Sequence, residues 1–248
     1  MSEKPSKDLL NELAPTGVLR AGINLSNYLL VTGKSSSGEP VGVAPDMARA
    51  IAERLGVQLK LVPFETPGEL ADAALSNVWD IGLIGAEPVR AEKITFSAAY
   101  VEIEATYLVP AGSPLQTIKD VDRPGVRIAL MARSAYDLWL VRHIKHAQLV
   151  YADSGDAAFK LFVSEKLEAL ASLRPGLLID LHKLPDARIL EGQFTAVQQA
   201  IGTPKPNAAG AAFLKRFVEE AKTSGFVASL IARHQVQGLS VAPPGQAA

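Results

Sequence analysis

Two charged side chains close together in the chain, Glu87 and Arg90, offer the clearest prospect of ligand chemistry in this 248-residue sequence. They follow an apolar run at residues 80–85 that is typical of a strand ending in a glycine turn, of which Gly85 is part. Side chains placed there lie at the carboxyl end of a sheet, where ligands bind in open α/β folds. The planar guanidinium of Arg90 suits a carboxylate, which it can hold through two hydrogen bonds. A surface arginine after a turn is the alternative interpretation.

The composition allows one large or two small domains and removes several classes of function. Hydrophobic residues make up 48% of the chain, enough for a sizeable core, and the formal net charge is only −1. Because there is neither a basic excess nor a run of lysine and arginine, we expect no nucleic-acid partner. The chain contains no cysteine, which excludes disulfides and thiolate metal sites.

The start of the chain bears on the compartment. No apolar run approaches the ~18 residues of a membrane span. Residues 1–17 are polar and lack the apolar core of a secretory signal. Two explanations stay open: a signal was removed and a start codon added, or the protein stays inside the cell.

The first hundred residues alternate between strand and helix patterns. Apolar positions at helical spacing predict a helix over residues 45–55, with Pro45 as its first residue, and a second over 66–75, with Pro67 just inside its start. Runs of β-branched and aliphatic residues predict strands over residues 18–24, 58–64 and 80–85. This β-α-β-α-β order is typical of a parallel sheet covered by helices.

A second alternation follows a strand at residues 104–110 that has no helix before it. Strands are predicted over residues 126–131, 148–151, 167–173 and 195–202. Helices are predicted over residues 134–146, 156–163, 178–184, 208–222 and 226–235. We also expect a lead-in helix within residues 1–15, after a disordered start, and a loose tail over residues 242–248.

The two α/β units are joined by two extended segments, residues 104–110 and 195–202. Two connections of this kind predict a hinged pair of lobes with a binding cleft between them. The last two predicted helices must then pack against the first lobe.

The order of the motifs resembles the family 3, amino-acid-type solute-binding proteins of ABC importers. The matching segments are residues 17–23, 42–57, 79–81 and, most specifically, 90–97 followed by Tyr100. The resemblance implies an α/β, type 2 periplasmic binding protein fold, in which two lobes with two crossover strands close on the ligand. It implies a lead-in at 1–15, a first lobe of residues 16–106 plus 200–248 and a second lobe of residues 107–199.

The resemblance also implies roles for individual residues. Arg90 stands where the family's arginine grips the ligand carboxylate. In the second lobe the family offers a helix N-terminus whose backbone N–H groups complete that site. Here that start comprises Ser134, Ala135 and Tyr136, with Ser134 as cap and anion donor, and Arg133 stands at the usual glycine.

The chain departs from the family pattern in both lobes. The hydroxyl-rich stretch before the arginine is replaced by residues 85–88 and is shorter. The acidic residue for the ligand ammonium falls near Leu173, where no carboxylate stands and Arg174 follows. A buried ammonium without a partner is costly. Either Glu87 or another acid takes that role, or the ligand is not a standard α-amino acid.

Weaker candidates for the cleft are Asn27, after the first strand, and Gln198, on a crossover segment. His143 and His146 lie three residues apart on a predicted helix, but no acid cluster accompanies them, so we expect no metal site. No nucleophile elbow, Walker loop or dinucleotide fingerprint is present. We therefore expect no cofactor.

The sequence thus predicts a monomeric, periplasmic, non-enzymatic protein that captures a small carboxylate-bearing solute, amino-acid-like, and presents it to an ABC permease. A cytoplasmic sensor or orphan binding domain is the alternative that the missing signal suggests. A third reading is a dehydratase-like enzyme, because the fold hosts cyclohexadienyl dehydratase and Glu87 can serve as a general acid.

Overall fold

The computed structural model describes residues 4–245 and divides the chain into two units. Unit 1 comprises the chain through Glu102 together with the chain from Gln198 onward, and unit 2 comprises Ile103–Val197. Each unit is described by itself. In the described residues no helix is long and apolar enough to cross a membrane.

The sheet of unit 1 runs in the order β4-β1-β5-β11-β6. Its strands are β1 (Val18–Asn24), β4 (Gln58–Phe64), β5 (Ile81–Gly85), β6 (Ile94–Val109) and β11 (Thr195–Pro204). Strands β4, β1 and β5 are parallel, whereas β11 pairs antiparallel with β5. Short strands also occur at β2 (Gly33–Lys34), β3 (Pro40–Val41) and β12 (Ser240–Val241).

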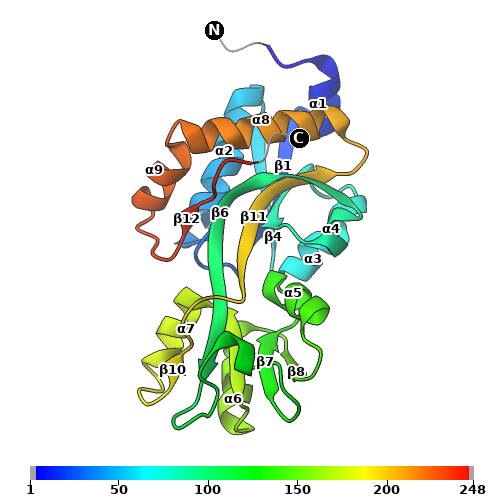
Figure 1. Cartoon of the computed structure of the whole chain (residues 1–248). Coiled ribbons are helices and arrows are strands. Elements are labelled where there is room, and N and C mark those ends of the chain that lie inside the picture. Colours follow the sequence, from blue (N-terminus) through cyan, green and yellow to red (C-terminus); the bar gives the residue numbers. More distant parts are fainter. Residues whose placement is uncertain (1–3, 246–248) are drawn as a thin grey trace. The chain divides into compact units, whose positions relative to one another are not determined.

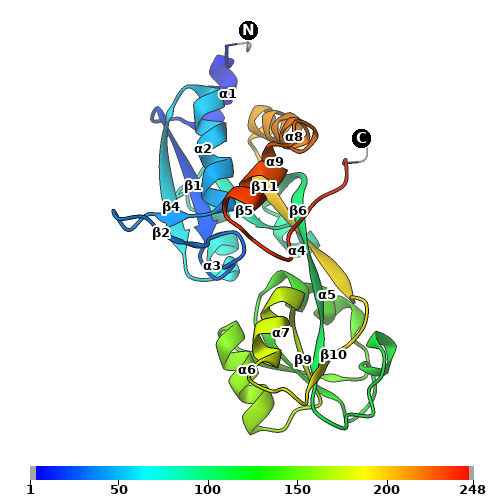
Figure 2. The same ribbon diagram turned by 90° about the vertical axis from the view of Figure 1, so that its left-hand side faces the viewer.

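Helices cover both faces of this sheet (Figure 2). One face carries α1 (Lys7–Leu13), α2 (Val43–Leu55), α8 (Ala208–Thr223) and α9 (Phe226–Arg233). The other carries α3 (Pro67–Asp72), which continues as a 3₁₀ turn at Ala73–Leu75. The predicted packing of the last two helices against this unit is confirmed.

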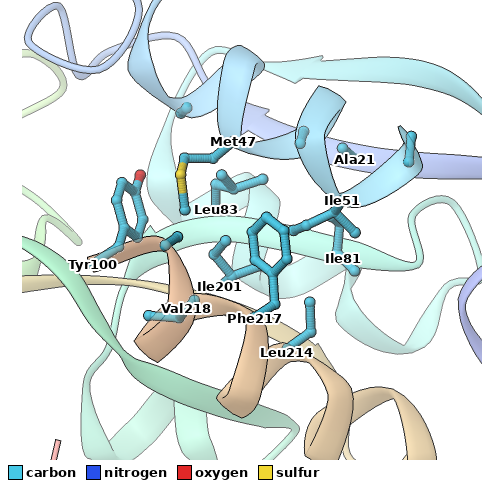
Figure 3. Packing of buried hydrophobic residues seen from close by; sticks show 14 of the residues in the cluster. Ala21, Met47, Ile51, Ile81, Leu83, Tyr100, Ile201, Leu214, Phe217 and Val218 are labelled. Carbon is cyan, nitrogen blue, oxygen red and sulfur yellow. The ribbon is translucent and has the colours of Figure 1, made fainter. Parts of the chain in front are cut away.

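Alternation along the strands directs side chains to the two faces. Ile81 and Leu83 enter the larger core, where Leu214 and Phe217 of α8 lie near Ile201 (Figure 3). Ile84 faces the opposite way and packs with the buried Trp79 and Leu70, and Trp79 Nε1 donates to the Leu70 carbonyl at 3.1 Å. The strands of unit 1 are thus packed on both faces, by the core around Trp79 on one side and by the core that includes α8 on the other. The candidate ligand groups follow the ends of these strands.

Helix α2 begins two residues before the predicted start, so the prediction that Pro45 is its first residue is wrong. Gly42 is the cap, with φ of 150°, and a Cβ there would lie 2.3 Å from the Leu30 carbonyl oxygen. Only glycine fits so close to another backbone. Pro45 is accommodated in the first turn, where the N–H groups have no partner within the helix.

Unit 2 has a sheet of β9 (Ala169–Leu173), β7 (Arg127–Met131) and β8 (Gln148–Ala152), which are parallel to one another. The far part of β6 pairs antiparallel with β9 and with β10 (Arg188–Ile189). Helix α5 (Ala135–His143) covers one face, and α6 (Gly155–Ser164) and α7 (Arg174–Leu181) cover the other (Figure 1). The second β-α-β alternation is confirmed.

Each unit contains an arginine–carboxylate clamp between neighbouring parallel strands. In unit 1 the backbone N and Nε of Arg20 donate to Asp80 Oδ2 at 2.8 and 3.0 Å. In unit 2 the backbone N and Nε of Arg127 donate to Glu168 Oε2 at 2.8 and 2.9 Å. In both, Nη2 reaches the second carboxylate oxygen, which makes the pair bidentate.

Three segments differ from the prediction. Strand β6 is one continuous strand of 16 residues, whereas the sequence analysis predicted a strand only over residues 104–110. Helix α7 begins at Arg174 rather than 178, because Pro175 favours the first helical turn. Residues 242–245 are held to unit 1, since the Ala242 and Gly245 N–H groups bond the Tyr100 carbonyl and Glu219. The rest of the predicted loose tail, residues 246–248, lies outside the described residues, and so do residues 1–3 of the predicted disordered start.

Candidate functional site

Arg90 is a buried cation at the carboxyl end of β5. It lies on the short helix α4 (Pro88–Ala91), which starts with proline and follows directly on the strand. Its side chain is only 5% exposed, and Nη1 donates to the Gly85 carbonyl oxygen at 2.7 Å. This bond fixes the guanidinium against the strand end, where the sequence placed a carboxylate-binding group. The alternative of an exposed surface arginine is wrong.

Glu87 is the cap residue of the same helix and is also buried, at 9% exposure. Its side chain makes no capping hydrogen bond to the helix. Unit 1 therefore carries one buried cationic and one buried anionic side chain within a single turn of chain.

Gly85 and Gln198 hold this turn in place through backbone contacts. Gly85 lies opposite Gln199 in the β5–β11 pairing, and the Ala86 N–H donates to the Gln198 carbonyl at 2.8 Å. The Gln198 side-chain amide donates to Glu102 at 2.8 Å. The structure gives Gln198 a positioning role for the turn that carries Glu87 and Arg90.

Asn27 follows β1 at the same edge of the unit 1 sheet. Its side chain is buried, and its amide oxygen accepts from the Leu29 N–H at 3.3 Å. Its backbone carbonyl accepts from Leu30 and Val31. Asn27 therefore shapes the loop after β1, and its side-chain NH₂ is the part suited to a ligand oxygen.

In unit 2 the corresponding strand-to-helix turn follows β7. Ser134 caps α5, and its Oγ accepts from the Asp137 N–H at 3.1 Å. Asp137 in turn accepts from the Arg133 N–H at 2.6 Å, so the helix start is closed by its own residues. The buried acid in the first turn also complements the positive end of the helix dipole.

Ser134, Ala135 and Tyr136 are all buried at this helix start. Burial raises the pKa of the Tyr136 phenol, and hydrogen bonds with Ser134 and Ser172 oppose that rise. The phenol is thus a neutral group tied to the cap rather than a proton donor poised near neutral pH. These three residues are brought together as the sequence predicted, with Asp137 as a fourth member.

Arg133 adopts a left-handed backbone conformation, with φ of 59°. Glycine adopts this conformation at little cost, whereas other residues pay about 1–2 kcal/mol. The family pattern had a glycine at this position, and the backbone keeps the shape that glycine favours. The side chain of Arg133 is exposed.

Leu173, where the family acid was expected, caps α7 and brings no polar side chain to the turn. Arg174 donates to Glu104 and to the Gly192 carbonyl within unit 2. Arg174 therefore has a structural role, which the sequence left open.

His143, the last residue of α5, packs against an aromatic side chain. His143 stacks on Trp139, with ring centroids 3.7 Å apart, and its Nδ1 lies 2.7 Å from the Trp139 carbonyl oxygen. Across residues 4–245 no group of three or more histidine and acidic side chains is placed to hold a metal ion.

Asp137 is the site-region residue that the sequence analysis missed. Its signal was the spacing Ser134-x-x-Asp137, which is the pattern of a reciprocal helix cap. The sequence analysis also missed the two arginine–carboxylate clamps, to which Asp80 and Glu168 contribute.

Two features define the class of protein: two α/β units, each built on parallel strands, and an arginine after the end of a strand. The class is the two-lobed type 2 periplasmic binding proteins, also called Venus-flytrap proteins. Residues 19–237 match the family described as bacterial extracellular solute-binding proteins, family 3. The chain belongs to this family, and the resemblance found in the sequence is confirmed.

Solved structures show the same fold. A mutant of ArgBP from T. maritima superimposes with a TM-score of 0.73 at 22% identity, covering 92% of this chain and 99% of that chain. A cysteine-binding protein from Campylobacter jejuni has a TM-score of 0.73 at 17% identity, covering 91% and 92%. An ancestral amino acid-binding protein, a precursor of cyclohexadienyl dehydratase, has a TM-score of 0.72 at 22% identity, covering 90% and 98%.

A curated relative is the cyclohexadienyl dehydratase of Pseudomonas aeruginosa, 25% identical over 165 residues. The match covers 65% of this chain and 61% of the relative, so the chain spans about three-fifths of that protein's length in the match.

Proposed function

We propose that this protein is the substrate-binding component of an ABC importer and captures a small carboxylate-bearing solute, an amino acid or a close analogue. The observation that carries the proposal is the buried guanidinium of Arg90 at the carboxyl end of β5, fixed by the Gly85 carbonyl. A buried cation is costly unless charged or hydrogen-bonding groups surround it. A ligand carboxylate would supply two charge-assisted hydrogen bonds.

In the proposed mechanism Arg90 of unit 1 forms an ion pair with the solute carboxylate. The N–H groups at the start of α5 are a second group of donors suited to an anion, described within unit 2 alone. The liganded form is the one that a permease recognises. Gln198 and Asn27 position the unit 1 turns around the solute.

The proposed setting is periplasmic, with a monomeric protein delivering its solute to an ABC permease. Membership of an extracellular solute-binding family supports this setting. A cytoplasmic sensor or orphan binding domain uses the same site without a permease. Fractionation of the native host separates the two, because only the first places the protein outside the inner membrane.

The test is substitution of the arginine. Native mass spectrometry of the freshly purified protein, compared with the denatured sample, detects a retained solute, and calorimetry with the twenty standard L-amino acids then gives affinities. Arg90→Ala is expected to weaken binding about 100-fold or more, since a buried ion pair loses one partner. Arg49→Ala, on the exposed side of α2, is the matched control and should bind as the wild type does. Equal binding by Arg90→Ala and wild type overturns the proposal.

A dehydratase is the second candidate function, favoured by the match to cyclohexadienyl dehydratase. Glu87 beside Arg90 is the acid available for proton transfer to a carboxylate-anchored substrate. Incubation with prephenate and with arogenate, followed by product analysis, tests this function. Absence of product removes these two substrates and leaves solute binding as the function the site supports.

A further inference from the structure

Unit 1 contains a second recess, formed by α1, α8 and the end of α2, which we call the α8 recess. Its volume is about 480 Å³, within the range of small-molecule sites. The lining side chains with a bearing on ligand binding are Lys4, Arg54, Phe213, Arg216, Phe217 and Glu220. We propose that the α8 recess binds an aromatic phosphate monoester. This site is separate from the proposed solute-binding site and goes beyond that function.

The α8 recess lies at the opposite edge of the unit 1 sheet from Arg90. Arg54 is in the last turn of α2, and β4 begins shortly afterwards at Gln58. The parallel strands β1 and β4 start at this edge, whereas Arg90 follows the carboxyl end of β5. Helix α1 packs beside α8 here (Figure 1). A ligand in the recess therefore does not compete for Arg90.

The lining of the recess has an excess of positive charge. Among the described residues that line it, Lys4, Arg54 and Arg216 are cations and Glu220 is the acid. Glu220 accepts from Arg54 Nη1 at 2.9 Å, so these two charges already form a pair. The charges of Lys4 and Arg216 remain. A phosphate monoester carries a charge of about −1.5 to −2 at pH 7, which balances these two cations.

Two phenylalanines of α8 give the recess an apolar wall. The rings of Phe213 and Phe217 have centroids 6.1 Å apart, and the two residues are 8% and 5% exposed. The Arg54 guanidinium lies over the Phe217 ring, 5.8 Å from its centroid. Aromatic rings stack favourably at centroid separations of about 4.5–7 Å. An aryl group can therefore contact this wall while its phosphate binds Arg216, whose planar guanidinium matches phosphate geometry.

The surroundings of the recess favour a small ligand over an extended polyanion. Asp8 and Glu53 are exposed acids, next in sequence to residues Leu9 and Arg54 of the lining. A nucleic acid needs a continuous basic surface, and these carboxylates interrupt one. The positive charge is thus confined to the recess itself.

The experiment titrates phenyl phosphate, inorganic phosphate and phenol into the full chain and measures binding by calorimetry. Arg216→Gln removes one cation at an exposed position, so the variant is expected to fold. The matched control is Lys215→Gln, because Lys215 is the preceding residue of α8 and is exposed but does not line the recess. Lys4→Gln is the second variant. Arg90→Ala tells the recess apart from the site at the end of β5.

We expect phenyl phosphate to bind with a Kd of about 1 mM or lower, and about 5-fold or more tightly than inorganic phosphate or phenol, since stacking adds to ion pairing. Arg216→Gln should weaken its binding about 10-fold, as loss of a charge-assisted hydrogen bond does. Lys4→Gln should weaken it less, because lysine is a flexible point charge. Lys215→Gln and Arg90→Ala should bind phenyl phosphate as the wild type does.

Three results would overturn the inference: no saturable binding, equal weakening by Arg216→Gln and Lys215→Gln, or inorganic phosphate binding as tightly as phenyl phosphate. Loss of phenyl phosphate binding in Arg90→Ala would also overturn it, because the anion would then occupy the site at the end of β5. The proposed function depends on amino acid binding instead, so it can fail or hold independently of these results.

Discussion

The two units contain the same arginine–carboxylate clamp, but the side chains of the two clamps differ in their exposure to solvent. In each, an arginine on the central strand grips a carboxylate that stands just before the neighbouring parallel strand, and also donates to a carbonyl in the preceding turn, at Asn77 or Lys166. Both of these turn residues have left-handed backbones, with φ of 53° and 49°. The clamp is therefore a repeated device for aligning the ends of two parallel strands.

Exposure separates the two clamps. The side chains of Arg20 and Asp80 are 19% and 4% exposed, whereas those of Arg127 and Glu168 are 38% and 35% exposed. Water screens charge pairs at the surface and leaves buried pairs largely unscreened. Two ion pairs of the same geometry are therefore expected to contribute differently to stability. The pair in unit 1 should contribute more than the pair in unit 2.

Removing the carboxylate from each clamp tests this comparison most strongly. Asp80→Ala should lower the free energy of unfolding by about 2 kcal/mol, because it leaves a partly buried guanidinium without its carboxylate partner. Glu168→Ala should cost clearly less, since water replaces the lost partner. Each unit contains one tryptophan, Trp79 or Trp139, so urea unfolding followed by fluorescence in Trp139→Phe and Trp79→Phe backgrounds reports the units separately. Equal losses would show that exposure does not set the strength of the clamp.

The starts of α4 and α5 differ as well, and the variant Ser134→Ala tests that difference. Ser134 caps α5, whereas Glu87 caps nothing in α4. Ser134→Ala should cost about 1 kcal/mol of stability, as loss of a serine cap does. Thermal unfolding of Ser134→Ala and of the wild type without solute measures this, and an unchanged melting temperature would contradict the capping role of Ser134.

The smallest expected effect is the pH dependence of the unit 2 clamp. Hydrogen bonds from Arg127 hold the pKa of the Glu168 carboxyl below its ordinary value. A lowered pKa in the folded state adds stability above the ordinary value, about 4.5, and that stability is lost as the pH falls through the folded pKa. The difference in unfolding free energy between wild type and Glu168→Gln should therefore be constant from pH 7 to 5 and shrink below pH 4.5. A difference that grows on acidification would show the opposite sign and refute the assignment.

Much of the fold could be predicted because periodicity and turn chemistry are local. Strands β1 and β4 were predicted at their observed bounds, and Pro67, predicted just inside a helix start, is the first residue of α3. The errors arose where distant contacts decide. The start of α2 depends on how closely Gly42 approaches Leu30, and the continuity of β6 depends on partners such as β9 and β12 that lie far along the chain.

The site was predictable to the extent that it follows from strand ends. Arg90, Glu87 and Ser134 lie at turns after strands, where the sequence predicted them, because each follows a recognisable strand; their roles in binding stay predictions. The burial of Glu87, the bond from Arg90 to Gly85 and the role of Asp137 depend on side-chain packing, which has no local signal. The structural role of Arg174 could not be predicted for the same reason, since its partner Glu104 lies 70 residues away in the sequence.

Unit 1 is made of two segments that are separated in the sequence, and this affects the order in which the chain folds. Unit 2 is a single continuous segment, whereas the unit 1 core joins β1 and α2 to α8 and α9, and the Gly210 N–H bonds Glu12 across a separation of 198 residues. Contacts this distant along the sequence form slowly, because a long loop must close first. During synthesis, unit 2 can therefore reach its native state while unit 1 still lacks the final fifth of the chain. An arrested or truncated product would contain a folded second unit and an unfolded first one.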